Sequence, residues 1–275
     1  MVKPTIDRAF DDWKEREALA EAMIPLIGKL YRRNVVLYMH GVPLFNESVV
    51  EIMRIHRRVR QIEKNELSEF ETHPMIAVLA ELDLAPAHVD IGKLASAFMT
   101  DPEGQSLVDY VKAACIDLLS AESAVSHPPR DVVIYGFGRI GRLVMRLLVE
   151  KAGGGQNLVP RAVVLRPPKD PLKDLHKRAS LMRRDSIHGP FKGTIRVDAE
   201  HQAIICNGNA IRFIYATDPG AIDYTVYGIQ DALIVDSTGA WRDIDGLGRH
   251  LTSKGVSKIL LTTSGKGEMK NIVSG

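Results

Sequence analysis

Apolar side chains near the start of the chain recur at three- and four-residue steps, which is the spacing of one face of an α-helix. The pattern predicts a helix over residues 6–31, with an apolar face formed by Ile6, Phe10, Trp13, Met23, Ile27 and Leu30 or Tyr31. The apolar segment 35–39 is either a short strand or a connection, and His40-Gly41-Val42-Pro43 ends it.

More helices are expected before residue 129. One should begin at Ser48, because Ser48 and Glu51 match a capping box, in which two side chains satisfy opposite backbone N–H groups. Others are predicted near residues 74–84, 90–99 and 107–120, with Asp90 as the N-cap of the second. Residues 1–129 are therefore expected to form an all-α N-terminal extension.

The hydrophobic pattern changes after segment 123–130, where His127-Pro128-Pro129 predicts a linker. A β-rich run at 131–135, helical spacing over 139–150 and an apolar run at 162–165 follow in order. This strand–helix–strand order indicates a parallel sheet with helices on its faces. Further strands are predicted at 194–197, 203–206, 211–215, 233–235 and 259–261, and Asn207-Gly208 should form a type I′ hairpin turn.

A glycine motif, Gly136-Phe137-Gly138-Arg139-Ile140-Gly141, follows the first strand of this second part directly. Gly136 allows the tight turn, Gly138 lets a pyrophosphate approach the backbone, and Gly141 lets the helix pack close to the strand. The helix N-terminus then offers N–H groups to the phosphates. Such a turn can also be a mere connection, but its flanking strands and helix favour a Rossmann-type NAD(P)-binding domain over 130–275.

The end of the second strand departs from the usual dinucleotide site, which has Asp or Glu there for the ribose hydroxyls. This chain has Leu165-Arg166-Pro167-Pro168-Lys169-Asp170 instead. A cation such as Arg166 removes repulsion toward a 2′-phosphate and can pair with it. We therefore expect NAD or NADP as cofactor, unless Arg166 only lies on a solvated rim.

From residue 131 onward the chain resembles the glyceraldehyde-3-phosphate dehydrogenase family. The segments that carry the resemblance are 135–142 (YGFGRIGR), 184–193 (RDSIHGPFKG), 236–241 (DSTGAW) and 261–267 (LTTSGKG). The N-terminal part resembles the extension of a longer proteobacterial form of this enzyme. Four motifs in order make the resemblance much more specific than any one of them alone.

The resemblance assigns roles by position. It implies that backbone N–H groups of Arg139 and Ile140 contact the pyrophosphate. It places Arg183 near the adenine. It places Thr238 and Gly239 along the dinucleotide, and Thr262 near the nicotinamide side. The family's ribose-binding aspartate falls on Pro167, so that contact is not carried over.

The resemblance also implies a phosphorylating aldehyde oxidoreductase acting on glyceraldehyde 3-phosphate and phosphate, in glycolysis or gluconeogenesis. In that family a cysteine thiolate in a Ser-Cys-Thr-Thr-Asn segment attacks the aldehyde. This sequence has no such segment; Cys115 is expected to be a packed core thiol and Cys206 to precede a hairpin. His188 is expected to be a loop histidine bonded to backbone, so we assign no catalytic residue.

Residues 271–273 resemble the start of another strand, so the chain is expected to be truncated before the catalytic domain and inactive alone, while the full-length enzyme is expected to be a tetramer. An alternative is a noncatalytic nucleotide-binding module whose helical part docks a partner. A third interpretation is nucleic-acid binding through residues 54–60 (RIHRRVR). Helical spacing of its apolar residues favours a solvated cationic face instead.

Composition restricts the partners, metal sites and cellular location that we expect. The 275 residues carry a net charge of +2 with 45% hydrophobic and 25% charged residues, an ordinary balance for a soluble protein that demands no nucleic acid or membrane. The two cysteines form neither a disulfide framework nor a zinc motif, and no metal is expected. No apolar run approaches the roughly 18 residues of a membrane span, so a cytoplasmic protein is expected.

Overall fold

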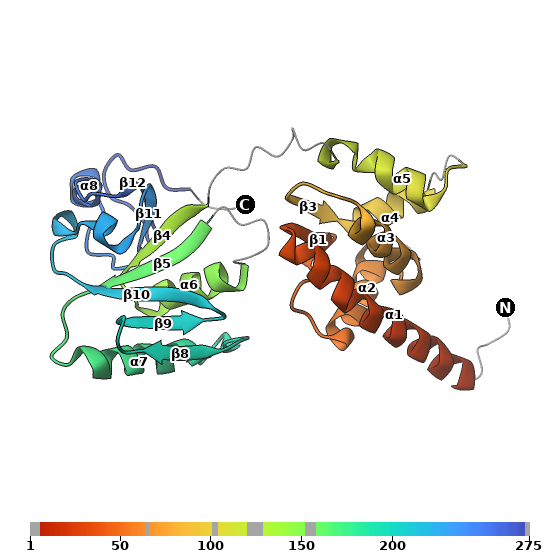
Figure 1. Ribbon diagram of the computed structural model, residues 1–275, viewed down its shortest axis with the longest axis horizontal. Coiled ribbons are helices and arrows are strands. Elements are labelled where there is room, and N and C mark those ends of the chain that lie inside the picture. Colours follow the sequence, from red (N-terminus) through yellow and green to blue (C-terminus); the bar gives the residue numbers. More distant parts are fainter. Residues whose placement is uncertain (1–5, 64–65, 101–103, 120–128, 152–157, 273–275) are drawn as a thin grey trace. The chain divides into compact units, whose positions relative to one another are not determined.

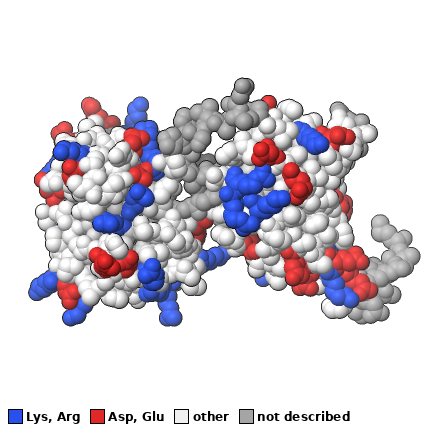
Figure 2. Space-filling model, viewed as in Figure 1, with Lys and Arg blue, Asp and Glu red and all other residues white. Residues whose placement is uncertain are grey.

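The computed structural model describes residues 6–63, 66–100, 104–119, 129–151 and 158–272. The chain folds into two compact units, which divide between His127 and Pro128 (Figure 1). Most of the linker predicted over 123–130 lies outside the described residues. Basic and acidic side chains are interspersed over the visible faces of both units (Figure 2). None of the described helices has the length and apolar composition needed to cross a bilayer.

The N-terminal unit packs helices around a small sheet. Its described elements are α1 (Ile6–Arg32), β1 (Val35–Met39), β2 (Val42–Pro43), α2 (Val49–Glu63), α3 (Glu69–Glu81), β3 (Ala87–Asp90), α4 (Ile91–Thr100), α5 (Leu107–Ala114) and the 3-10 helix η1 (Ile116–Leu118). The sheet has the order β2-β1-β3, with β1 and β3 parallel. The expectation of an all-α extension is therefore corrected: the apolar segment 35–39 is a strand, because β3 pairs with it.

Two predicted helix starts in this unit are confirmed. The Glu51 backbone N–H donates to Ser48 Oγ (3.3 Å) at the start of α2, and the Lys93 backbone N–H donates to Asp90 Oδ1 (3.1 Å) at the start of α4. The helix predicted near 74–84 begins earlier, at Glu69. A capping box between Ser68 and Glu71 starts it there, and the sequence pattern had not drawn attention to that pair.

The apolar stripe of α1 is only half covered. Met23, Ile27 and Leu30 are buried in the core of the N-terminal unit, as the helical spacing predicts. Phe10 and Trp13, nearer the start of the helix, are 62% and 45% exposed. The first half of α1 therefore presents large apolar side chains to its surroundings.

The C-terminal unit is built on a seven-stranded sheet. Its described elements are β4 (Arg130–Tyr135), α6 (Arg139–Lys151), β5 (Leu158–Leu165), α7 (Pro171–Arg183), β6 (Arg184–Asp185), β7 (Gly189–Pro190), β8 (Ile195–Asp198), β9 (Ala203–Cys206), β10 (Asn209–Tyr215), the 3-10 helices η3 (Pro219–Ala221) and η4 (Tyr224–Tyr227), β11 (Ala232–Asp236), α8 (Ile244–Leu251) and β12 (Val256–Leu261). The strand order is β12-β11-β4-β5-β10-β9-β8.

The five strands from β12 to β10 are parallel, and β9 and β8 continue the sheet antiparallel. This confirms the predicted α/β class with a largely parallel Rossmann-type sheet. Alternate residues of the central strand enter different cores: Val132 and Ile134 pack with α6 and α7, whereas Val133 and Tyr135 pack on the opposite face. Burial on both faces explains why residues 132–135 of β4 form an unbroken apolar run.

Local predictions in this unit have mixed outcomes. The hairpin turn is confirmed, since Asn207 (φ 46°) and Gly208 (φ 83°) both take the positive φ that a type I′ turn requires. Helices α7 and α8 were not predicted. For α7 a signal was present, because Asp170 caps the helix through the Lys173 backbone N–H (3.0 Å) and Pro171 occupies its first turn. Asn271 and Ile272 form no strand, and Val273 lies outside the described residues.

Candidate dinucleotide-binding cleft

A cleft of about 520 Å³ opens at the carboxyl ends of the parallel strands in the C-terminal unit. It lies where β4 has β5 on one side and β11 on the other, which is the point where the strand order reverses. Open α/β sheets bind ligands at such a switch point. Of the residues predicted for the cofactor, four line the cleft, namely Gly136, Gly138, Arg166 and Thr238.

The three glycines of the motif differ sharply in the space around them. A Cβ on Gly136, whose φ is 90°, would meet Thr238 Cγ2 at 2.6 Å, and a Cβ on Gly141 would meet the carbonyl oxygen of Gly136 at 2.3 Å. A Cβ on Gly138 would meet nothing within 4 Å. Gly136 and Gly141 are thus required by packing, whereas Gly138 leaves open space beside the cleft.

Helix α6 begins directly after Gly138. Its first residues are Arg139 and Ile140, and the Arg142 backbone N–H donates to the Gly138 carbonyl (3.1 Å) as the helix starts. The N–H groups of a first turn have no acceptor within their own helix and carry the positive end of its dipole. The helix N-terminus at the cleft is therefore suited to an anion.

Two arginines hold the turn before α6. Arg142 Nη1 and Arg178 Nη1 donate to the Phe137 carbonyl oxygen at 3.3 and 3.5 Å. Arg178 also pairs with Asp174 (3.1 Å), whose other oxygen accepts a hydrogen bond from the Tyr215 hydroxyl (3.4 Å). Burial and the neighbouring Asp174 raise the pKa of Tyr215 to about 12, so this hydroxyl stays a donor. Arg178 itself lines the cleft and adds positive charge there.

The opposite wall is the turn after β11, which the buried carboxylate of Asp236 organises. Its Oδ1 accepts from the backbone N–H and the hydroxyl of Thr238, both at 2.7 Å, and its Oδ2 lies 3.1 Å from His250 Nε2. Asp236 and His250 are fully buried. The pair fixes the Ser237–Thr238 turn at the edge of the cleft.

Two aromatic rings complete this wall. The Tyr135 ring packs edge-on against Trp241 and His250, with centroids 5.6 and 4.6 Å apart. Burial raises the pKa of Tyr135 to about 12, and the negative charge of Asp236 acts in the same direction. Tyr135 and Trp241 both line the cleft, so it has an apolar side opposite its arginines.

The residues present fit a dinucleotide. Gly138 leaves a space that any other side chain would fill, next to a helix N-terminus. Ser237 lines the cleft, and its hydroxyl is buried without a hydrogen-bond partner among the residues that the structure describes. An unpartnered buried hydroxyl calls for a polar ligand, because desolvation without a hydrogen bond costs free energy.

The other predicted cofactor residues lie around the cleft rather than in its lining. Arg139, Ile140 and Gly141 form the start of α6, and Gly239 follows Thr238. Thr262 lies at the end of β12, where its backbone N–H donates to the Asp236 carbonyl (3.0 Å).

Arg183 is directed elsewhere, because its guanidinium donates to the Ile195 carbonyl (2.8 Å) on β8. Several residues that line the cleft had been given no cofactor role from the sequence, namely Ala216 and Thr217, and also Ser237 and Trp241 of the segment 236–241.

The two cysteines and His188, which are the candidate nucleophiles and base of the chain, do not line the cleft. Burial raises the pKa of Cys206 to about 12, and burial also raises the pKa of Cys115. His188 is exposed, and its backbone N–H and ring Nδ1 both lie 3.0 Å from Asp185 Oδ1. These contacts, led by the backbone N–H, lower the pKa of Asp185. Within the described residues no group of three or more His, Cys, Asp or Glu side chains could hold a metal ion.

Fold and cleft together define a Rossmann-type dinucleotide-binding domain. Residues 130–244 match the family model of the NAD-binding domain of glyceraldehyde 3-phosphate dehydrogenase. A glyceraldehyde-3-phosphate dehydrogenase-like protein of Pseudomonas aeruginosa is 51% identical over 256 residues, which are 92% of this chain and 55% of that protein. The similarity therefore covers both units.

Glyceraldehyde-3-phosphate dehydrogenases of Ajellomyces capsulatus and Drosophila melanogaster are 36% and 38% identical over 131 and 129 residues, or 48% and 47% of this chain. The aligned parts are 35% and 34% of those proteins. These similarities support a relationship of the chain to the glyceraldehyde-3-phosphate dehydrogenase family. The chain spans about half the length of the Pseudomonas relative and about a third of the other two.

Proposed function

We propose that the cleft binds NAD or NADP and that the chain is the coenzyme-binding part of a phosphorylating glyceraldehyde-3-phosphate dehydrogenase. The observation that carries the proposal is the open space at Gly138 next to the N-terminus of α6. A diphosphate fits there because the first-turn N–H groups and the helix dipole favour an anion. Backbone N–H groups of Arg139 and Ile140 are the proposed donors.

The other residues of the cleft orient the rest of the molecule. When bound, the coenzyme supplies the hydride acceptor of an aldehyde oxidation. The Ser237 hydroxyl, which has no hydrogen-bond partner among the described residues, would gain one from the coenzyme. The rings of Tyr135 and Trp241 form an apolar wall that excludes water from one side. Thr238, Gly239 and Thr262 are proposed to lie along the dinucleotide toward its nicotinamide.

Arg166 is the proposed determinant of coenzyme choice. It is exposed at the end of β5 and lines the cleft, where many dinucleotide sites carry a carboxylate. A guanidinium there can pair with a 2′-phosphate. We expect NADP to be accepted as well as NAD, and glyceraldehyde 3-phosphate with phosphate to be the substrates of the complete tetrameric enzyme in the cytoplasm.

Trp241 provides the assay for coenzyme binding. The chain has two tryptophans, so Trp13→Phe leaves Trp241 as the single reporter in the cleft. Both coenzymes should change its fluorescence, and Arg166→Ala should weaken NADP at least tenfold while changing NAD little. An NAD affinity at least tenfold higher than that for NADP in the unsubstituted chain would exclude a role for Arg166 in accepting the 2′-phosphate.

A noncatalytic coenzyme-binding module is the second candidate function. It is favoured because burial raises the pKa of both thiols, Cys115 and Cys206, and so disfavours the reactive thiolate. The chain incubated with glyceraldehyde 3-phosphate, phosphate and NAD should form no NADH, although it binds NAD. Formation of NADH that Cys206→Ser abolishes would instead make Cys206 a nucleophile and contradict the assignment of no catalytic residue. Cys115→Ser is the matched control, since that thiol is also buried but lies in the other unit.

A further inference from the structure

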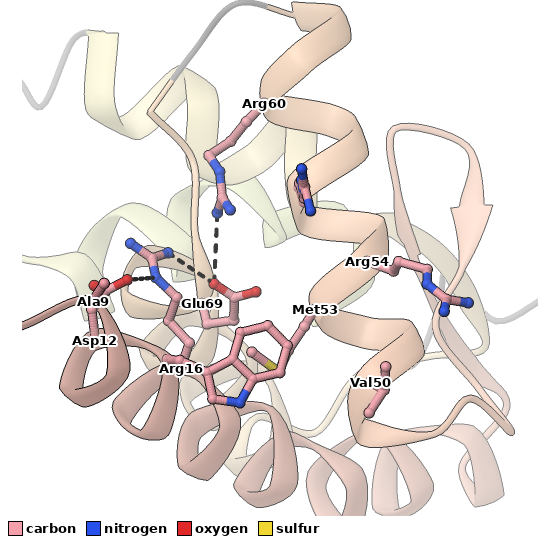
Figure 3. A pocket seen from close by; sticks show the side chains of 10 residues that line it. Ala9, Asp12, Arg16, Val50, Met53, Arg54, Arg60 and Glu69 are labelled. Atoms are coloured by element: carbon pink, nitrogen blue, oxygen red, sulfur yellow. Dashed lines mark hydrogen bonds and ion pairs between the residues drawn. The ribbon is translucent and has the colours of Figure 1, made fainter. Parts of the chain in front are cut away.

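A second pocket, of about 370 Å³, lies in the N-terminal unit between the first half of α1 and one face of α2 (Figure 3). We call it the Trp13 pocket. Helix α1 contributes Trp13 and Arg16, and helix α2 contributes Arg54, Arg57 and Arg60. The three α2 arginines recur at three-residue steps, so they share one side of the helix. This pocket is separate from the coenzyme cleft, which belongs to the other compact unit.

At the floor of the Trp13 pocket, acidic and basic side chains form ion pairs that neutralise one another's charge. The Glu69 side chain is 1% exposed, and its Oε2 lies 3.1 Å from Arg16 Nη1 and 3.7 Å from Arg60 Nη1. Arg16 also pairs with Asp12 at 2.8 Å, as the dashed lines in Figure 3 show. Burial lowers the pKa of the adjacent His56, which keeps it from adding charge. Two carboxylates thus balance two guanidiniums, and a buried charge needs such partners.

The rim of the Trp13 pocket carries positive charge that is not balanced in this way. Arg57 is exposed and forms no ion pair with any residue that the structure describes. Arg54 points away from Glu69 (Figure 3) and pairs with Glu51, three residues earlier, at 2.9 Å, with its side chain 70% exposed. Such an exposed pair contributes little free energy, so Arg54 can exchange it for a ligand.

An aromatic surface lies in the same pocket. Trp13 is 45% exposed, and Met53 from α2 also lines the pocket. Indole rings stack on the planar bases of nucleotides, and a guanidinium matches the geometry of a phosphate. The volume lies within the range of pockets for small ligands.

We propose that the Trp13 pocket binds a small phosphate ester that carries a planar ring, in the size class of a nucleoside monophosphate. Arg57 pairs with the phosphate, Arg54 turns toward it, and Trp13 stacks on the ring. Arg16 and Arg60 stay with Glu69 and hold the two helices in place around the ligand.

Adenosine monophosphate is the probe, and the full chain is the protein. Trp241→Phe leaves Trp13 as the only tryptophan, so fluorescence reports this pocket alone. The nucleotide should change the Trp13 emission and give calorimetric heat, whereas adenosine and inorganic phosphate should each bind at least tenfold more weakly. Equal binding of inorganic phosphate and the nucleotide would remove the ring from the proposal and overturn it.

Arg57→Ala is the decisive variant, and Arg58→Ala is its matched control. Both arginines are exposed, adjacent on α2 and without an ion pair among the described residues, but Arg58 does not line the Trp13 pocket. Arg57→Ala should weaken the nucleotide at least tenfold, and Arg58→Ala should leave it within twofold. Circular dichroism melting should show the same midpoint for both variants.

Three results would overturn the proposal. One is an equal loss in the two variants, which indicates only a diffuse charge effect. Another is calorimetric binding of the nucleotide with no change in Trp13 fluorescence and no loss of affinity in Arg57→Ala, because the nucleotide would then occupy the coenzyme cleft. The third is salt-sensitive binding of a single-stranded oligonucleotide at least tenfold tighter than the mononucleotide, which would make α2 a nucleic-acid face.

Discussion

Alanine substitutions in the glycine motif separate coenzyme binding from packing, because the space around each glycine differs. An added Cβ at Gly138 has no neighbour within 4 Å, whereas at Gly141 it would lie 2.3 Å from the carbonyl oxygen of Gly136. Gly138→Ala should therefore fold but obstruct the diphosphate, and Gly141→Ala should disturb the fold itself. Gly248→Ala in α8 is the control, since it also has open space and lies outside the cleft lining.

The magnitudes follow from these contacts. A forced contact in a packed region costs about 1–3 kcal/mol, and a backbone oxygen cannot rotate away. Replacing a helical Gly by Ala returns about 1 kcal/mol, which leaves a net loss of up to about 2 kcal/mol for Gly141→Ala. Alanine is less favourable than glycine at the N-cap position of a helix, so Gly138→Ala should lower the free energy of unfolding by at most about 1 kcal/mol. Loss of one charge-assisted hydrogen bond to the diphosphate costs about 1.5–3 kcal/mol, roughly tenfold to 150-fold in affinity.

Urea unfolding and coenzyme titration, both followed by Trp241 fluorescence in the Trp13→Phe background, measure the two quantities separately. The expected result is weak NAD binding with near-normal stability for Gly138→Ala, and lowered stability for Gly141→Ala. Gly248→Ala should match the unsubstituted chain in affinity. Normal NAD affinity in Gly138→Ala would refute the reasoning, because the open space would then have no role in binding.

Three further predictions concern single side chains. Hydrogen bonds from the His188 backbone and ring lower the pKa of Asp185, so its contribution to stability is present above the unfolded value of about 3.9 and is lost as pH falls through the lower folded value. Calorimetry should show a lower melting temperature for Asp185→Asn at pH 7, with the difference closing below about pH 4; a constant difference would contradict this. A thiol reagent at pH 8 should modify neither Cys115 nor Cys206 until urea unfolds the chain, and rapid labelling of the folded chain would contradict the burial argument. Asp236→Ala should lower the free energy of unfolding by about 1–3 kcal/mol and weaken NAD, because Thr238 and the buried histidine lose their acceptor; unchanged urea unfolding would contradict it.

The central β4–α6–β5 segment was predictable because its signals are local. An apolar run that is buried on both faces, the glycine motif and a helical period lie next to one another in the sequence. The Asn207-Gly208 turn is similarly local, since few other residues take two positive φ values in succession. These elements therefore agree with the structure.

Other features depend on residues far apart in the chain. The cleft is lined by residues at the ends of β4, β10 and β11. The strand order that brings these ends together cannot be predicted from any local sequence pattern. Ala216 and Thr217 were missed for this reason, whereas Trp241 lies three residues after the predicted Thr238 and was overlooked. The strand at 35–39 remained ambiguous because its partner, β3, lies about fifty residues away. Helix α7 is different: its Asp170-Pro171 start was available locally but overlooked.

A crystal structure of the chain grown with NAD tests the central claim most directly. The account predicts diphosphate oxygens within hydrogen-bonding distance of the backbone nitrogens of Arg139 and Ile140, over Gly138, with the adenosine ribose on the Arg166 side of the cleft. A coenzyme bound with its diphosphate away from this turn, or a cleft filled by the chain's own side chains at saturating NAD, would contradict it.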